Sequence, residues 1–295
     1  MNPLHHSFVS FVALLCVFPS SLALVTAQSG NPPADDTPAE KAPARLEEWP
    51  ELAKPQKDRA LALCGQFQKD DEKLHAQATE ELLALGAGAA PLLFQRVSDR
   101  PENRNEHLFA VFDSMLDRRH SALMARQCKK PQIELRRYLI RRLCAFAEIE
   151  LLPVLKAHAG DKDAATAFFA SLGMLALKQK DAVAPVLAYT KTRWDEAGDV
   201  VAAVLTTARS DEVGGWLWDA IADARPTDQM AGLRLLRYAA PRQQASRLRP
   251  YLESPDHTVK KEAVNTARVL HGEAPLENLS VFQAIELSKQ WLQKL

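Results

Sequence analysis

The stretch LRPYLESPDHTVKKEAVNTARVLHG, residues 248–272, contains two helix-forming segments joined by a turn. The turn, Ser254-Pro255-Asp256, offers side-chain oxygens that can cap the exposed amides of a following helix. Val259 and Ala263 then lie four residues apart, as on one face of a helix, and Gly272 falls where that helix should end. The stretch predicts a helical hairpin. A hairpin this short cannot bury its apolar face alone, so neighbouring hairpins must stack on it.

The same pattern recurs along the chain at a nearly constant spacing. Successive first segments start 31, 31, 32, 31 and 31 residues apart, and RALALCGQF (59–67) fits as the first unit. A fixed period of this kind is the sequence signature of a repeat solenoid. The later first segments are AAPLLFQRV (89–97), HSALMARQC (120–128), LLPVLKAHA (151–159), VAPVLAYTK (183–191), GGWLWDAIA (214–222) and ASRLRPYLE (245–253).

A second amphipathic segment follows each first one. In ELRRYLIRRLCAFA (134–147), Leu135, Leu139, Leu143 and Phe146 form one apolar stripe with the arginines opposite. Only 11 glycines occur, and residues that favour helices predominate. The sequence therefore predicts an all-α fold: a right-handed α-solenoid of about seven helical hairpins with a period of about 31, closed by a C-terminal capping helix.

Residues 57–272 resemble HEAT-like repeats, on the strength of the 248–272 stretch and of ATEELLALGAGAAPLLFQRVSD (78–99). The short period is similar to that of the bacterial variety related to phycobilisome lyase repeats. The resemblance implies that the second helices line a concave surface where partners bind.

The ends of the chain differ from the repeats. Phe8 to Val25 is apolar and uncharged and is followed by small residues, which predicts a signal peptide over 1–27; an uncleaved anchor is the alternative, since the run is barely long enough to span a bilayer. A disordered, proline-rich linker is predicted for 28–55, the repeats for 56–272, and the capping helix for 273–295, with Phe282 and Trp291 on its apolar stripe. The chain is thus expected to be exported, to the periplasm or the medium.

Charge distribution supplies the candidate binding residues. The 37 basic and 37 acidic residues balance, so no global field draws nucleic acid or anionic lipid, and neither nucleic-acid binding nor membrane insertion after cleavage is expected. Basic residues nevertheless cluster on second segments. Their interpretation as a grip on an acidic partner competes with a solvated face whose arginines pair with acids of the neighbouring repeat. The candidate partner-binding residues are Arg136, Arg137, Arg141, Arg234 and Arg237.

The sequence offers little for catalysis. Cys64, Cys128 and Cys144 are too far apart along the predicted hairpins to form a disulfide and are interpreted as small core residues. The histidines form no metal-binding spacing, and neither a nucleophile elbow nor a phosphate loop occurs, so no metal, cofactor or catalytic residue is predicted.

The predicted function is an exported, non-catalytic scaffold that binds a protein or peptide partner on its concave face. Two alternatives remain: an enzyme of the HEAT-like lyase or glycosylase type, and a structural component of a cell-envelope assembly.

Overall fold

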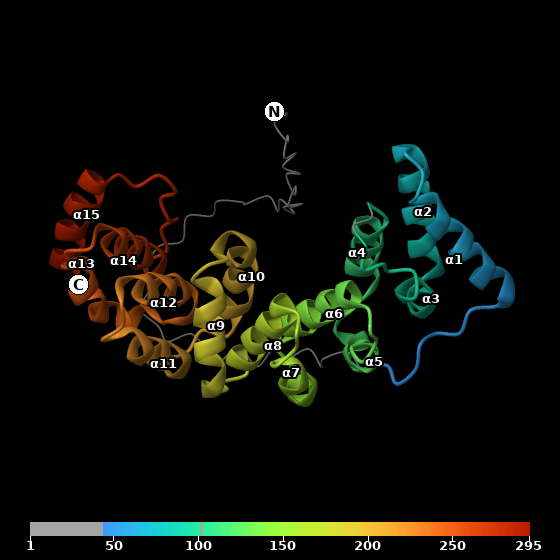
Figure 1. Ribbon diagram of the computed structural model, residues 1–295, viewed down its shortest axis with the longest axis horizontal. Coiled ribbons are helices and arrows are strands. Elements are labelled where there is room, and N and C mark those ends of the chain that lie inside the picture. Colours follow the sequence, from blue (N-terminus) through green and yellow to red (C-terminus); the bar gives the residue numbers. More distant parts are fainter. Residues whose placement is uncertain (1–43, 101–102) are drawn as a thin grey trace, which may run out of the picture. The chain divides into compact units, whose positions relative to one another are not determined.

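The computed structural model describes residues 44–100 and 103–295, and within these ranges the chain forms α-helices and 3-10 helices without a β-strand (Figure 1). The predicted all-α solenoid is confirmed: seven helical hairpins follow one another in the described residues, and a last helix comes after them. The signal peptide predicted for 1–27, and the linker as far as residue 43, lie outside the described residues.

The second helices of the hairpins carry most of the packing between repeats. Contacts join α2 to α4, and also join each of α6, α8, α10 and α12 to the second helix of the next repeat. These helices are α2 (Glu72–Leu85), α4 (Asn103–Met115), α6 (Ile133–Phe146), α8 (Ala164–Ala176), α10 (Trp194–Thr207), α12 (Pro226–Ala239) and α14 (His257–Leu270).

Most of the first helices are shorter than the second helices, and most begin with a 3-10 turn. They are α1 (Lys54–Gln66), α3 (Ala90–Phe94), α5 (Ser121–Gln127), α7 (Leu152–His158), α9 (Val183–Thr190), α11 (Asp211–Ile221) and α13 (Arg249–Leu252). The 3-10 helices are η1 (Ala87–Ala89), η2 (Arg118–His120), η3 (Ile149–Leu151), η4 (Lys180–Ala182) and η5 (Arg242–Leu248). Pro91, Pro153 and Pro250 lie at the first two positions of their α-helices. A proline fits there because the first-turn amide has no partner within the helix.

Close packing fixes the register of α6 against α8. Leu139 and Leu143 of α6 are fully buried, and Gly173 of α8 lies at the contact. A Cβ atom at Gly173 would lie 2.9 Å from Leu155 Cδ1 and 3.1 Å from Cys144 Cα. Glycine therefore allows the two second helices to approach one another, which positions the side chains on their shared surface.

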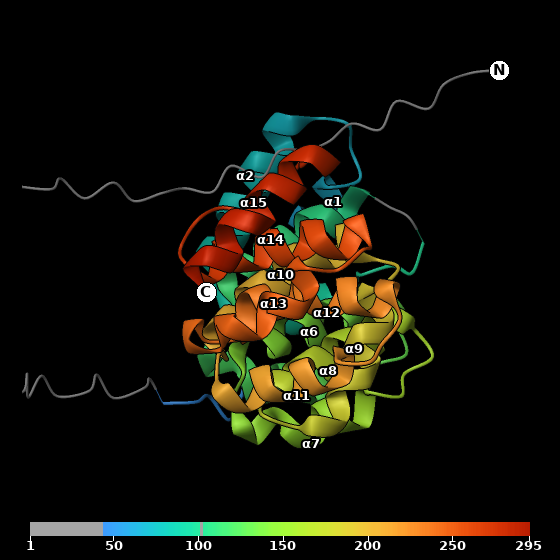
Figure 2. The same ribbon diagram turned by 90° about the vertical axis from the view of Figure 1, so that its left-hand side faces the viewer.

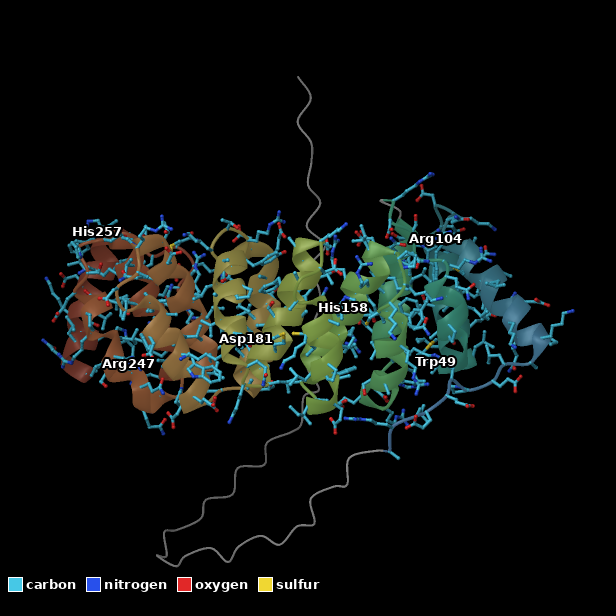
Figure 3. All side chains as sticks on the ribbon, turned by 60° about the horizontal axis from the view of Figure 1, so that its bottom comes forward. Trp49, Arg104, His158, Asp181, Arg247 and His257 are labelled. Atoms are coloured by element: carbon cyan, nitrogen blue, oxygen red, sulfur yellow. The ribbon has the colours of Figure 1, made fainter. Side chains whose placement is uncertain are left out.

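Residues 44–53 correct the predicted linker. They are not helical, but Leu52 is buried, and Trp49 (labelled in Figure 3) packs with its ring centroid 5.8 Å from that of Phe94. The Leu46 amide donates to the Arg119 carbonyl at 2.9 Å. The predicted linker therefore extends too far, because its last part contains apolar side chains that pack against the first repeats.

The last helix, α15 (Val281–Lys294), contacts α13 and α14 (Figure 2). It lies within the 273–295 segment predicted to hold it. Ala284, Ser288 and Trp291 face the preceding hairpin, whereas Phe282, predicted on the apolar stripe, is 73% exposed. The helix turns Trp291 inward, and Phe282 then falls outside the buried face.

Candidate functional site

Four of the five predicted arginines pair with acids of the following repeat, and two of these four lie on α6. Arg136 of α6 donates to Asp161 through Nε at 2.7 Å and Nη2 at 3.1 Å. Arg137 donates to Asp163 through Nη2 at 2.8 Å and to Glu134 through Nη1 at 2.9 Å. The Arg137 guanidinium holds the pKa of Asp163 well below its usual range. Both arginines are thus part of the contact between neighbouring repeats.

Arg234 and Arg237 of α12 share one carboxylate, that of Glu262 on α14. Arg234 Nε donates to Glu262 Oε1 at 2.9 Å, and Arg237 Nη2 donates to Oε2. Arg237 is buried, and burial lowers the pKa of its guanidinium to about 10. This pair of arginines lies apart from Arg136 and Arg137, so the structure does not bring the five candidates into one patch.

Arg141 differs from the other four. It lies on α6 one turn after Arg137, its side chain is exposed, and it makes no ion pair or hydrogen bond with any residue of the described ranges. It lines a cavity of about 260 Å³, here called the aromatic pocket. The residues lining the aromatic pocket are Phe109, Glu134, Arg137, Tyr138, Arg141, Ala165, Phe168, Phe169, Tyr189 and Glu196.

Two stacked ring pairs and a fifth ring line the aromatic pocket. Phe109 of α4 stacks on Tyr138 of α6, with centroids 4.6 Å apart and planes 3° from parallel. Phe168 of α8 stacks on Tyr189 of α9, with centroids 4.2 Å apart and planes at 10°. Phe169, the fifth ring, lies 5.2 Å from Phe168 between centroids. The pocket is therefore assembled from helices of successive repeats.

Polar contacts hold the two tyrosine rings in place. The Tyr138 hydroxyl donates to Asp113 Oδ1 at 2.9 Å, and burial raises the pKa of that hydroxyl. The Tyr189 hydroxyl contacts Glu196 Oε2 at 3.5 Å, and the Arg193 guanidinium lies 5.7 Å from the Tyr189 ring centroid. Because these rings have fixed orientations, little side-chain entropy remains to be lost when a ligand enters.

The acidic groups of the pocket already have cationic partners. Glu134 accepts a hydrogen bond from Arg137, and Glu196 Oε2 lies 3.3 Å from Arg193 Nη1. Asp163, beside the pocket, is paired with Arg137. Among the lining residues, Arg141 is therefore the ionic group without a counter-charge in the described part of the chain.

Two larger hollows have walls less suited to recognition. One of about 610 Å³ lies between α9 and α11, with Trp216 and four alanines, and Asp181 (labelled in Figure 3) also lines it. Its Asp228 is paired with Lys191 at 2.5 Å. The other, of about 790 Å³, lies beside Trp218 and Tyr251, and Arg247 lines it. The alanine walls of the first hollow give a ligand few specific contacts, and the second has two aromatic side chains in its lining where the aromatic pocket has five.

The cysteines and histidines form no comparable site. Cys64, Cys128 and Cys144 are buried free thiols, and burial raises the pKa of Cys128 to about 12. His75 and His107 have ring centroids 4.2 Å apart, but no group of three or more potential metal ligands occurs in residues 44–100 and 103–295. Within the same ranges, no helix has the length and apolar character to cross a membrane.

Comparison with known proteins gives one structural match to report. No family model and no curated protein sequence matches the chain. Human deoxyhypusine hydroxylase, solved in complex with glycerol, matches with a TM-score of 0.32 and 14% identity, over 82% of this chain and 98% of that one. At these values the match assigns no activity and no residue role.

The predicted function is corrected at this point. The matched chain is an enzyme by its name, whereas the predicted function was a non-catalytic scaffold for a protein or peptide; the scaffold is not retained. The prediction that the chain is not an enzyme stays a prediction, as does export.

Sequence reasoning found Arg137 and Arg141 but missed the rings around them. No role was predicted for Phe109, Tyr138, Phe168, Phe169 or Tyr189. Phe168-Phe169 carried a usable signal, because adjacent residues point about 100° apart on a helix and two bulky rings cannot both take the centre of one buried face. Ring stacking between α4 and α6 and between α8 and α9 is invisible in the sequence.

Proposed function

We propose that the chain binds a small organic molecule with one or two rings in the aromatic pocket. The observation that carries the proposal is the enclosure of one cavity by five aromatic side chains from four helices. Aromatic faces and edges bind planar molecules through dispersion and quadrupole contacts, in addition to the area that they bury.

The size of the pocket limits the ligand. An apolar cavity of about 150 Å³ is large enough for benzene. The aromatic pocket measures about 260 Å³, which suits a single substituted ring or a fused pair. The pocket is partly open, and Phe109 and Tyr189 are only half-buried, so a ligand can enter from solvent. An enzyme would recognise its substrate in the same way, so binding here is compatible with either class of protein.

The test is calorimetric titration with a panel of neutral, anionic and cationic naphthalene derivatives. Ala165 lines the pocket, and Ala165→Trp would fill it. Ala184→Trp is the matched control, since Ala184 is exposed and lines the groove between α9 and α11. We expect at least one compound to bind the wild type and Ala184→Trp, and to lose binding to Ala165→Trp.

Two results would overturn the proposal. One is that no compound of the panel binds the wild type. The other is that Ala165→Trp binds as the wild type does. Thermal unfolding of both variants shows that each is folded, so a loss of binding reports on the pocket.

A further inference from the structure

We infer that the ligand of the aromatic pocket is an anion, and that Arg141 recognises its carboxylate or an equivalent acidic group. This inference rests on the proposed function, because it specifies the ligand class of the same pocket. It follows from the ion pairs around the cavity, since the lining acids Glu134 and Glu196 each contact an arginine, whereas Arg141 contacts no acid in the described residues.

Arg137 is already paired with two carboxylates. Its guanidinium binds Asp163 and Glu134 together, at 2.8 Å and 2.9 Å, and the paired carboxylates raise the pKa of Arg137 further above its usual range. Arg137 thus has no free charge to offer a ligand. It holds the walls of the pocket together by joining α6 to the start of α8.

Arg141, in contrast, has no acidic partner in the described residues. It lies four residues after Arg137 on the same helix, where two like charges repel by a few tenths of a kcal/mol in an isolated helix. Its neighbour Arg142 lies 3.4 Å from Asp113 and donates to the Leu116 carbonyl at 2.8 Å, whereas Arg141 has no such partner in the described residues. An exposed guanidinium beside a cavity keeps its donors available for an incoming group.

The N–H donors of the Arg141 guanidinium match the acceptor oxygens of a carboxylate. A guanidinium presents two parallel N–H groups to a carboxylate and also stacks on a flat ring. Arg141 therefore complements a ligand whose ring lies among the aromatic side chains and whose acidic group points to the mouth. A ligand amine would be repelled by Arg141, and the two lining glutamates already contact arginines of the chain.

The experiment compares three compounds with one ring system: naphthalene-2-carboxylate, its carboxamide and the corresponding methylamine. We expect the wild type to bind the carboxylate about tenfold more tightly than the carboxamide, as a charge-assisted hydrogen bond implies. Added salt should reduce this preference. Arg141→Gln should bring the two affinities within about twofold, and Arg141→Glu should favour the amine.

The matched control is Arg118→Gln. Arg118 is also exposed and without an ion pair in the described ranges, but it does not line the pocket. Its variant should keep the wild-type preference. Equal binding of the three compounds to the wild type, or an unchanged preference in Arg141→Gln, would overturn the anion inference and leave the aromatic pocket intact. Absence of all binding would instead remove the proposed function.

Discussion

Arg137 of α6 and Asp163 at the start of α8 form a two-point ion pair, with Nη2–Oδ1 at 2.8 Å and Nε–Oδ2 at 3.0 Å. Oδ2 of the same carboxylate also accepts from the Thr166 amide at 2.9 Å and from the Thr166 hydroxyl at 2.7 Å. Asp163 therefore caps its own helix while it binds the preceding repeat. One side chain links helix initiation to the stacking of two hairpins beside the aromatic pocket.

Replacing Asp163 by Asn should destabilise the protein and alter its response to acid. We expect a loss of about 2 kcal/mol in the free energy of unfolding at neutral pH, since a cap and a charged pair are both weakened. Arg137 lowers the pKa of folded Asp163, so its stabilisation is fully present above the unfolded pKa of about 4 and is lost as the pH falls through the lower folded value.

Urea unfolding of wild type and Asp163→Asn at neutral and acidic pH measures this effect. The difference in stability should be largest at neutral pH and should shrink below about pH 4. Asp199→Asn is the control, because Asp199 is exposed and has no partner in the described residues. A pH-independent difference would show that the ion pair contributes little.

Replacing Gly173 or Gly215 by alanine should change the stability of the protein in opposite directions. A Cβ atom at Gly173 would meet Leu155 and the Cys144 backbone, whereas one at Gly215 has no heavy atom within 4 Å. We expect Gly173→Ala to cost about 2 kcal/mol by overpacking. Gly215→Ala should stabilise by up to about 1 kcal/mol through helix propensity. Thermal unfolding of both variants checks this, and a stabilised Gly173→Ala would contradict the packing of α6 against α8.

The fold could be predicted because each repeat shows its own helix pattern and the period aligns them. Leu135, Leu139 and Leu143 lie on the buried side of α6, and Asp256 caps α14 through the amides of Thr258 and Val259, at 2.8 Å and 3.1 Å. These are local rules, which act within one hairpin. The burial of Leu52 could not be predicted in this way, because Leu52 packs against Gly88 of η1, a contact that the pattern within one hairpin does not show.

The sequence left open whether the arginines bind a partner or pair with acids of the neighbouring repeat, but the spacing of the acids could have indicated the pairing. Arg136 pairs with Asp161, Arg137 with Asp163 and Arg237 with Glu262, which are 25, 26 and 25 residues downstream. Each separation is slightly less than one period, so each arginine contacts an acid that belongs to the following repeat. A search for acids at this separation would have distinguished these three arginines from Arg141.

Leu52 provides a test of the segment that packs before the first hairpin. Leu52 is 6% exposed, and a Cβ atom at Gly88 would lie 2.4 Å from the Pro50 carbonyl oxygen, which shows how closely this segment approaches η1. We expect Leu52→Ala to lower the free energy of unfolding by about 2 kcal/mol. The neighbouring Glu51 is exposed, and Glu51→Ala should change stability by less than about 0.5 kcal/mol. Equal stabilities of the two variants would contradict the packing.

The three buried thiols should react only when the helices around them open. Thiolate is the reactive form, and burial raises the pKa of Cys128 to about 12, so both access and ionisation oppose alkylation. We expect iodoacetamide to modify Cys64, Cys128 and Cys144 slowly in buffer and rapidly in concentrated urea, as measured by peptide mass spectrometry. The alkylation rate of a free, exposed thiol rises strongly between about pH 7 and pH 9. Rapid, similarly pH-dependent labelling of Cys128 in the native protein would show that α5 and α6 separate readily, and that the α6 side of the aromatic pocket is not fixed.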